Sequence, residues 1–317
     1  MIKIRNIYEL NKLKKCDYDN VISVTLINSN LINIPLIIYK MCNLKKLILD
    51  KNELTYISSK ISILTKLEEL SLFDNKITDI SSIIYQMNNL QKLSLEKNQL
   101  TKISSKIGNS IKLQELNLSK NNLTKIPSSI CNLTNLENLF IDNNKLIKIP
   151  SSINKLYNLI FLDVSNNQLT VIPETIYDLT NLQYLQLYKN KLIKISSNIG
   201  KLNNLLELGL GDNLLTTLPS TIGNLINLYH FEINNNKIIN LPSSIKNIKH
   251  KYFINESSYN NLNNLPYECT YLQIYGLKTN ITNLPPFIKE IRLYEPIIKD
   301  IKVPYGCVLY IDDIKIE

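Results

Sequence analysis

The feature that most constrains the fold is a 23-residue repeat, seen best in the segment LQELNLSKNNLTKIPSSICNLTN at residues 113–135. The repeat follows the pattern LxxLxLxxNxLxxIPxxIxxL, and one polar position in it recurs ten times at a spacing of 23 residues without insertion. The ten residues are Ser29, Asn52, Asn75, Asn98, Asn121, Asn144, Asn167, Asn190, Asn213 and Asn236. A fixed period of this length is typical of a solenoid, in which one structural unit is stacked many times.

Each part of the repeat predicts a local structure. Leu113, Leu116 and Leu118 predict a short strand with one buried face. Asn121 follows this strand, and its side-chain amide can both donate to and accept from backbone groups of its own and adjoining turns. An unpaired buried backbone group costs about 1–3 kcal/mol, so we expect the nine asparagines at this position to form a structural ladder. Pro127 predicts the start of a short helical turn on the outer side.

Two departures from the repeat pattern carry local expectations. Serine replaces the proline at Ser58, Ser81, Ser104 and Ser196. A serine side chain can cap a helical turn, so we expect the same geometry there. Ser110 lies where other copies carry an apolar residue such as Leu133 or Leu156, which predicts a local packing weakness.

The repeat resembles the leucine-rich repeats, with LxxLxLxxNxL in most copies. Its IPxxIxxLxxL continuation, as in LTKIPSSICNLTNLENLFIDNNKL, is similar to the intracellular repeats of Ras-suppressor and scaffold-type proteins. The resemblance covers residues 21–250 closely and the remainder loosely. It implies an α/β solenoid, a horseshoe with a parallel concave sheet and short helical or extended turns on the convex side. It also implies that a protein partner binds on the concave sheet.

The register of the repeat divides the chain into three regions. We expect an N-terminal cap at residues 1–20, ten regular repeats at 21–250, and about three shortened repeats with a C-terminal cap at 251–317. In the N-terminal cap, Ile4, Ile7 and Tyr8 predict an amphipathic helix that covers the open end of the sheet. A targeting segment is the alternative interpretation of this cap.

Beyond residue 250 the repeat becomes irregular. The outer anchors continue at Leu265-Pro266, Leu284-Pro285 and Val303-Pro304, and Thr279 and Pro296 stand where asparagine is expected. The shorter spacing predicts extended outer segments, and residues 250–261 predict a loop or a distorted strand. Residues 308–311 predict a closing strand whose edge is blunted by the acidic end DDIKIE. A separate small C-terminal domain is the alternative.

Cysteine usage and composition bear on the compartment. The five cysteines are scattered without a CxxC motif, which favours reduced thiols; they are Cys16, Cys42, Cys131, Cys269 and Cys307. The chain begins without the long apolar core of a signal peptide, and no run approaches a transmembrane span. We therefore expect a cytoplasmic monomer.

The abundance of Asn, Ile and Lys indicates an AT-rich genome, such as that of a protist or a large DNA virus. If the source is a virus, the compartment is the host cytoplasm.

No motif predicts an enzyme, a metal site or a cofactor. His230 and His250 lie apart from any cysteine or carboxylate at metal-ligand spacing. The sequence contains neither GxxxxGK[ST] nor GxGxxG, and its 7 glycines leave little room for a phosphate-binding loop. We expect a non-enzymatic scaffold that binds another protein.

The candidate partner-binding residues are the strand positions that point away from the core, because the scaffold does not dictate them. Four aromatic residues occupy such positions in repeats six to eight, namely Phe140, Phe161, Tyr184 and Tyr188. Neighbouring strands lie about 4.8 Å apart, so we expect one contiguous aromatic patch. Carboxylates surround it at Glu115, Asp142, Asp163, Glu207 and Glu232, which favours a partner with basic residues at its rim. We assign partner binding to the four aromatics with Asp142 and Asp163; chance scatter is the alternative.

A second candidate surface is a row of lysines in the turn that follows the asparagine ladder. The row comprises Lys102, Lys125, Lys145, Lys148, Lys191, Lys194 and Lys237. A polyanion or an anionic membrane could bind to this lysine rim, chiefly through Lys125, Lys145, Lys148, Lys191 and Lys194. We rank nucleic acid and membrane below a protein partner, because no arginine or aromatic is interleaved and a solvated lysine ridge also keeps a protein soluble.

Overall fold

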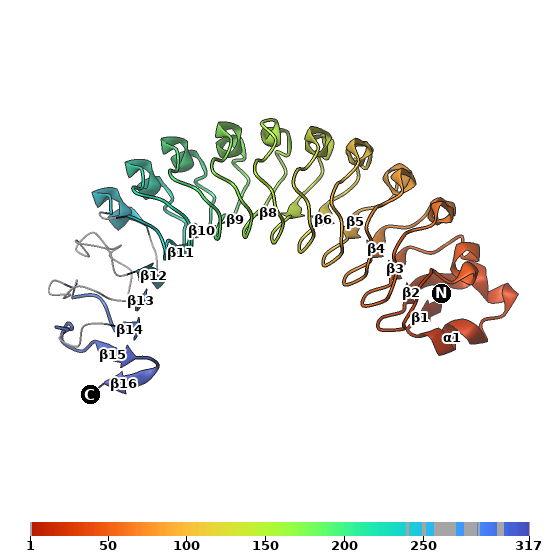
Figure 1. Cartoon of the computed structure of the whole chain (residues 1–317), viewed down its shortest axis with the longest axis horizontal. Coiled ribbons are helices and arrows are strands. Elements are labelled where there is room, and N and C mark those ends of the chain that lie inside the picture. Colours follow the sequence, from red (N-terminus) through yellow and green to blue (C-terminus); the bar gives the residue numbers. More distant parts are fainter. Residues whose placement is uncertain are drawn as a thin grey trace. The chain divides into compact units, whose positions relative to one another are not determined.

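The computed structural model describes residues 2–238, 241–248, 252–256, 271–275, 284, 286–296 and 301–316. It divides into two compact units, Met1–Leu159 and Ile160–Glu317. In each unit the regular repeats each place one strand in a parallel sheet and one short 3₁₀ helix on the opposite side (Figure 1). Taken by itself, each unit is therefore a solenoid of the predicted class.

The first unit has seven strands, which pair in chain order and are all parallel. They are β1 (Ile2–Ile4), β2 (Val21–Thr25), β3 (Lys46–Ile48), β4 (Glu69–Ser71), β5 (Lys92–Ser94), β6 (Glu115–Asn117) and β7 (Asn138–Phe140). The helices are α1 (Ile7–Lys12), η1 (Lys15–Asn20), η2 (Leu36–Lys40), η3 (Ser59–Ile63), η4 (Ser82–Gln86), η5 (Ser105–Asn109), η6 (Ser128–Asn132) and η7 (Ile153–Lys155).

The second unit continues the same pattern and ends in a hairpin. Its strands are β8 (Phe161–Asp163), β9 (Tyr184–Gln186), β10 (Glu207–Gly209), β11 (His230–Glu232), β12 (Tyr252–Glu256), β13 (Tyr271–Tyr275), β14 (Glu290–Tyr294), β15 (Val308–Ile311) and β16 (Ile314–Ile316). Strands β8 to β15 are parallel, and β16 pairs antiparallel with β15. The described helices of this unit are η8 (Glu174–Asp178), η9 (Ser197–Lys201), η10 (Ser220–Asn224) and η11 (Ser243–Asn247).

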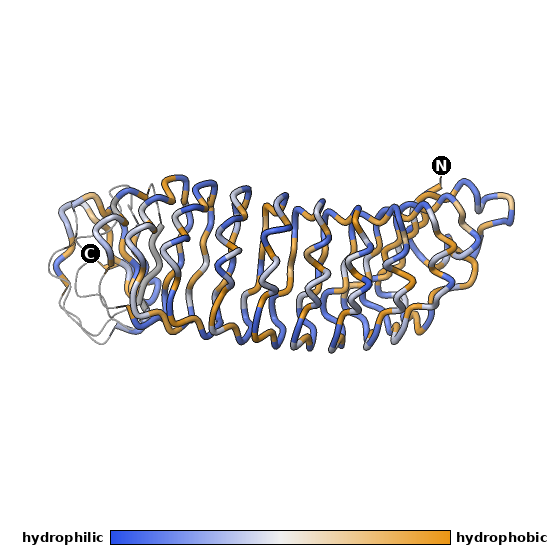
Figure 2. The backbone as a smooth tube through the Cα atoms, turned by 90° about the horizontal axis from the view of Figure 1, so that it is seen from above, coloured by the Kyte–Doolittle hydropathy of each residue, from blue (hydrophilic) through white to orange (hydrophobic). Residues whose placement is uncertain are grey.

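The core consists of the repeated apolar positions. In the fifth repeat, Leu113, Leu116, Leu118 and Leu123 are completely buried, and Ile130 at the outer helix is buried as well. Because a single repeat cannot cover these side chains, neighbouring repeats bury them against each other. Figure 2 shows the result as hydrophobic and hydrophilic segments that alternate along the coils of each unit.

Each ladder asparagine links its own turn to the preceding repeat. The Asn121 amide nitrogen donates to Leu118 O (3.1 Å), to Ser119 O (3.1 Å) and, in the preceding repeat, to Leu95 O (2.9 Å). Its Oδ1 accepts from the Leu100 N–H at 2.9 Å. The side-chain amide has two N–H hydrogens and three carbonyl acceptors, so one hydrogen is shared between two carbonyl oxygens. The ladder asparagines are buried, and their amides replace the water that these backbone groups lose.

A second row of asparagines lies at the other end of the strands, just before the first leucine of the repeat. The Asn135 amide donates to Ile111 O at 2.8 Å, a carbonyl 24 residues earlier. The same bond is made by Asn43, Asn89, Asn158, Asn204 and Asn227. Sequence reasoning missed this row because lysine replaces asparagine in some repeats, as at Lys66 and Lys112.

The residue before each ladder position adopts a left-handed conformation, with φ between 48° and 55° from Asn28 to Asn235. Asparagine and aspartate tolerate this region better than other side chains do. Lysine nevertheless occupies it at Lys51, Lys97, Lys120 and Lys189. The turn geometry is therefore set by the ladder bonds that follow, and the local preference of lysine is overridden.

The serines that replace proline cap the outer helices, as predicted. The hydroxyl of Ser58 accepts from the Lys60 N–H at 3.3 Å, and that of Ser196 accepts from the Asn198 N–H at 3.2 Å. Ser81 and Ser104 do the same for η4 and η5.

The N-terminal prediction was wrong in one respect. Ile4 does not lie on a helix with Ile7 and Tyr8, because it ends β1 and pairs with Val24 of β2. The helix α1 starts only at Ile7, after Asn6, whose side chain accepts from the Glu9 N–H at 2.9 Å. Tyr8 is 66% exposed. A parallel strand therefore covers the sheet edge, because the alternating Ile2–Ile4 segment precedes a strong helix cap.

The C-terminal prediction also needs correction. Strand β15 forms where predicted, but it does not close the sheet. The acidic segment turns back through Asp312 and Asp313, whose φ values of 48° and 64° fit a two-residue hairpin turn, and forms β16. In the segment 250–261, residues 252–256 form β12. The predicted positions Leu265, Pro266, Thr279 and Pro285, together with His250 and Cys269, lie outside the described residues.

Ser110 is the weak point that the repeat pattern predicts. It is 4% exposed, and its hydroxyl has no hydrogen-bond partner among the described residues. It lines a hollow of about 130 Å³ together with Met87, Asn88, Asn109, Ile111 and Lys112. A small polar side chain thus occupies a leucine position and leaves both space and an unsatisfied hydroxyl.

Replacing one ladder asparagine should destabilise the protein strongly. Asn121→Ala leaves the Leu100 N–H and three carbonyls without their partner, so we expect the free energy of unfolding to fall by about 3 kcal/mol. Asn122→Ala, one residue further on, is the matched control and should cost less than about 0.5 kcal/mol. Denaturant unfolding measures both; equal losses would contradict the role of the ladder.

Filling the hollow at Ser110 should stabilise the protein. Ser110→Leu restores the apolar side chain found in other repeats and removes the unsatisfied hydroxyl, so we expect a gain of about 1–2 kcal/mol in thermal or denaturant unfolding. Ser105→Leu, at an exposed site of η5, the helix that Ser110 follows, should give no such gain. A loss of stability in Ser110→Leu would show that the site is already fully packed.

Candidate functional site

One row of outward-facing strand positions in the first unit alternates lysine and glutamate, whose charges neutralise one another. Lys46, Glu69, Lys92 and Glu115 stand in register on β3 to β6. Lys46 Nζ lies 2.7 Å from Glu69 Oε1, and Lys92 Nζ lies 3.2 Å from Glu115 Oε2. Each of these pairs is partly exposed, so its contribution to stability is small. Glu115, which the sequence suggested for a basic partner, is therefore already paired with a lysine.

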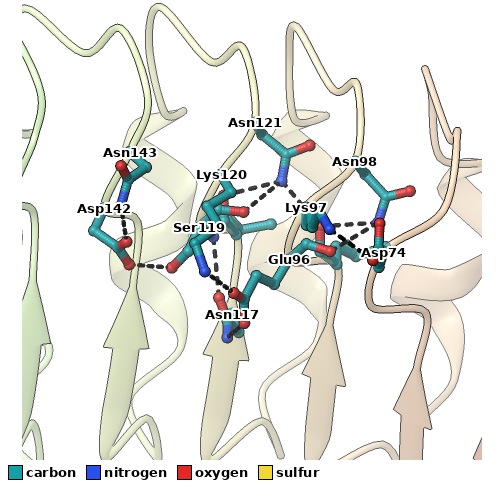
Figure 3. A network of polar contacts seen from close by, with 12 residues as sticks. Asp74, Glu96, Lys97, Asn98, Asn117, Ser119, Lys120, Asn121, Asp142 and Asn143 are labelled. Atoms are coloured by element: carbon teal, nitrogen blue, oxygen red, sulfur yellow. Dashed lines mark hydrogen bonds and ion pairs between the residues drawn. The ribbon is translucent and has the colours of Figure 1, made fainter. Parts of the chain in front are cut away.

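A second charged row lies at the ends of the strands, beside the asparagine ladder (Figure 3). Lys97 Nζ lies 2.7 Å from Asp74 Oδ2, and Lys120 Nζ lies 2.7 Å from Glu96 Oε1. Asn117 also donates to Glu96 at 3.0 Å. These contacts join side chains of neighbouring repeats, so this row satisfies much of its own charge.

Phe140 and Asp142, two of the predicted site residues, belong to the first unit. Phe140 ends β7 and is half-buried. The Asp142 carboxylate accepts from the Ser119 hydroxyl and, at 2.5 Å, from the Asn143 side-chain amide (Figure 3). Asp142 is thus held by neutral donors of its own unit.

The other predicted aromatics lie in the second unit, and two of them are in contact. The rings of Phe161 on β8 and Tyr184 on β9 stack, with centroids 5.4 Å apart and an interplanar angle of 26°. Both residues are half-buried on the outward side of the sheet. The Asp163 carboxylate accepts from the Ser165 N–H at 2.9 Å and from the Ser165 hydroxyl at 2.6 Å.

The Tyr188 ring lies beside Gly209 of β10. Gly209 is an outward position of that strand, and Gly211 follows the strand by two residues. A Cβ atom at Gly209 would lie 3.5 Å from Tyr188 Cδ1 and 2.0 Å from Gln186 Oε1. A Cβ atom at Gly211 would lie 2.5 Å from Asn234 Oδ1. The glycines therefore let neighbouring side chains lie over the backbone of β10.

Glu207 stands next to the stacked aromatics and is held by neutral groups. It is in register with Tyr184. Its carboxylate accepts from the Tyr229 hydroxyl at 2.7 Å and from the Gln186 amide at 3.4 Å. The bond to Glu207 raises the pKa of Tyr229 to about 12, and a hydrogen bond with Tyr184 adds to this effect. Sequence reasoning missed Tyr229, because it precedes the strand and is not one of the strand positions that point away from the core.

His230 is the in-register neighbour of Glu207 on the other side. Its Nε2 lies 2.7 Å from Glu232 Oε1. The hydrogen bond to Glu232 raises the pKa of His230 above its ordinary value, against the opposing effect of burial, and the charge of Glu207 acts in the same direction.

The lysines of the predicted rim are all exposed. Lys125, Lys145 and Lys148 belong to the first unit, and Lys191 and Lys194 to the second. The ion pairs recorded among the described residues use other lysines, such as Lys46, Lys92 and Lys97. Apolar side chains also stand between the rim lysines, since Ile147 is 60% and Ile193 53% exposed.

The described part of the chain holds neither a metal-binding cluster nor a membrane-spanning helix. No group of three or more His, Cys, Asp or Glu side chains within it is placed to hold a metal ion. Among its helices, none has the length and apolar character that crossing a bilayer requires.

Known proteins match this chain in sequence pattern and in fold. A model described as a leucine-rich repeat region matches residues 93–210, and a model for two copies of leucine-rich repeats matches residues 42–85 and 65–108. No curated protein sequence matches.

Among solved structures, an internalin, InlF, from Listeria monocytogenes has a TM-score of 0.78 and 25% identity over 95% of this chain and 89% of its own. A leucine-rich repeat protein from Leptospira interrogans has a TM-score of 0.62 and 27% identity over 90% and 81% of the two chains. A chain in the octameric complex of latrophilin 3, Unc5D and FLRT2, the last present as its leucine-rich repeat part, has a TM-score of 0.60 and 27% identity over 73% of each chain.

The His230–Glu232 pair predicts a pH dependence. Because the folded state raises the pKa of His230, the stabilisation from the pair is fully present below the unfolded-state pKa and is lost as the pH rises through the folded-state value. NMR titration should place the pKa of His230 above 6.5, and Glu232→Gln should lower it. His230→Asn assigns the signal, since the chain has only 2 histidines. An unchanged pKa in Glu232→Gln would contradict this pairing.

Proposed function

We propose that this chain, which belongs to the leucine-rich repeat proteins, is a non-enzymatic module that binds another protein on the outward strand face of its repeats. Proteins of this family generally mediate protein–protein interactions. The observation that carries the proposal is the stacked pair Phe161 and Tyr184, which stands on the side of the sheet opposite the core leucines. Leu162 and Leu185, between the outward positions, are completely buried, so the core does not require these rings.

Relatives of similar fold support a protein partner. One chain of similar fold comes from an octameric complex with several different proteins. By analogy, the repeats of this chain would present side chains at fixed spacing to a partner. Because a rigid array loses little conformational entropy on binding, most of the contact energy remains available for affinity. The aromatic rings would supply the buried anchors of such an interface.

Removing the aromatic anchors should abolish partner capture. We expect a variant with Phe140, Phe161, Tyr184 and Tyr188 replaced by alanine to lose the protein that wild type captures from cell lysate. The matched control replaces Tyr56 and Tyr305, exposed tyrosines that are not on the outward strand face, and should retain capture. Circular dichroism and thermal unfolding check that both variants are folded. Capture that survives in the folded quadruple variant would contradict the proposal.

The lysine rim is the second candidate surface, for a polyanion or an anionic membrane. The observation that favours it is the exposure of Ile147 and Ile193, each flanked in sequence by two rim lysines. Exposed apolar side chains beside lysines suit the interface of an anionic membrane.

Binding at this rim should fall steeply as salt increases, whereas aromatic anchoring should be nearly insensitive to salt. Lys191→Gln with Lys194→Gln would weaken only rim binding.

A reducing, cytoplasmic setting is part of the proposal. The cysteines among the described residues, Cys16, Cys42, Cys131 and Cys307, are free thiols. Free thiols in a protein with several cysteines fit a reducing compartment.

A further inference from the structure

The outward positions of β8 to β11 form rows in register across the second unit. The first row contains Phe161, Tyr184, Glu207 and His230. The second contains Asp163, Gln186, Gly209 and Glu232. A third set follows each strand by two residues, with Ser165, Tyr188, Gly211 and Asn234. These twelve positions include three carboxylates and no lysine or arginine.

A glutamate at the first outward position of the repeat has different neighbours in the two units. Glu69 and Glu115 in the first unit each have a lysine as an in-register neighbour and form an ion pair with it. Glu207 occupies the same position in its repeat, but its neighbours in register are Tyr184 and His230. The donors to its carboxylate, Tyr229 and Gln186, are neutral. Its negative charge is therefore not neutralised by a lysine as the charge of Glu115 is.

The side chains around Glu207 suit a planar cation. Tyr184 presents an aromatic ring that already stacks on Phe161 at a centroid distance of 5.4 Å. The strands that carry Tyr184 and Glu207 are paired, so these two residues are in-register neighbours on backbones about 4.8 Å apart. Gly209 on β10 adds no side chain of its own, and the Gln186 side chain, which donates to Glu207, lies over its backbone. A guanidinium group can stack on an aromatic ring and pair bidentately with a carboxylate, which an ammonium group cannot do.

We infer that the protein partner inserts an arginine side chain at this place, stacked on Tyr184 and paired with the Glu207 carboxylate. This inference rests on the proposed function and specifies the chemistry of the partner at that same face. Glu232 lies in the next row on β11 and is paired with His230 at 2.7 Å, so Glu207 is the carboxylate assigned to the arginine. The net charge of the whole chain is +9, so long-range attraction does not by itself bring a basic peptide to the surface. Recognition of arginine has to come from this local arrangement.

Fluorescence anisotropy with a labelled peptide of alternating glycine and arginine tests the inference, with lysine and glutamate peptides of the same length for comparison. We expect wild type to bind the arginine peptide more tightly than the lysine peptide and not to bind the glutamate peptide. Glu207→Gln, which keeps an acceptor for Tyr229 and removes the charge, should weaken arginine binding about tenfold. Glu115→Gln is the matched control and should change it less than about twofold. Tyr184→Leu should remove the preference for arginine over lysine.

Three results would overturn the inference: no saturable binding of the arginine peptide, equal affinity for the arginine and lysine peptides, or equal losses in Glu207→Gln and Glu115→Gln. Partner capture separates this failure from that of the proposed function. If capture is lost in the aromatic variant but survives Glu207→Gln and excess arginine peptide, the partner binds on this face without arginine. If capture survives in every variant, both the inference and the proposed function fall.

Discussion

The hydrogen bonds of the ladder asparagines are the constraint on which the rest of the structure depends. Each side-chain amide binds carbonyls of its own turn, one carbonyl of the preceding repeat and one N–H of that repeat, as Asn121 does with Leu95 and Leu100. The turn after each strand is consequently fixed, including the left-handed residue before the asparagine. With the turns fixed and the repeat held at 23 residues, neighbouring strands pair in the same register along each unit.

This constraint separates residues that maintain the fold from residues that are free to serve binding. The leucines, the asparagines and the outer isoleucines are dictated by packing, so their identity carries no information about a partner. Only the outward strand positions and the rims vary freely. In the first unit these positions hold lysine–glutamate pairs such as Lys46–Glu69, whereas in the second they hold the Phe161–Tyr184 stack and Glu207.

The sequence was sufficient for the strands, the ladder and the outer turns, because agreement among ten copies outweighs the ambiguity of any one. The strands, the outer helical turns and the serine caps followed from it. It failed where a feature occurs once, as at β1 and β16, or where the residue type varies, as in the second asparagine row interrupted by Lys66. For the site, spacing indicated that Phe161 and Tyr184 are neighbours. It could not show that Lys92 pairs with Glu115 or that Tyr229 reaches Glu207, since these depend on side-chain conformations.

Site-specific photo-crosslinking tests most directly whether the outward strand face of the second unit is the binding surface. A photoreactive p-benzoylphenylalanine would replace Tyr184 in one variant, exposed Tyr56 in a second and rim residue Lys194 in a third. Irradiation of each variant with the captured partner should give a covalent adduct from position 184 and none from positions 56 and 194. Adducts from position 194 in the absence of any from position 184 would contradict binding on the strand face and would place the partner on the lysine rim.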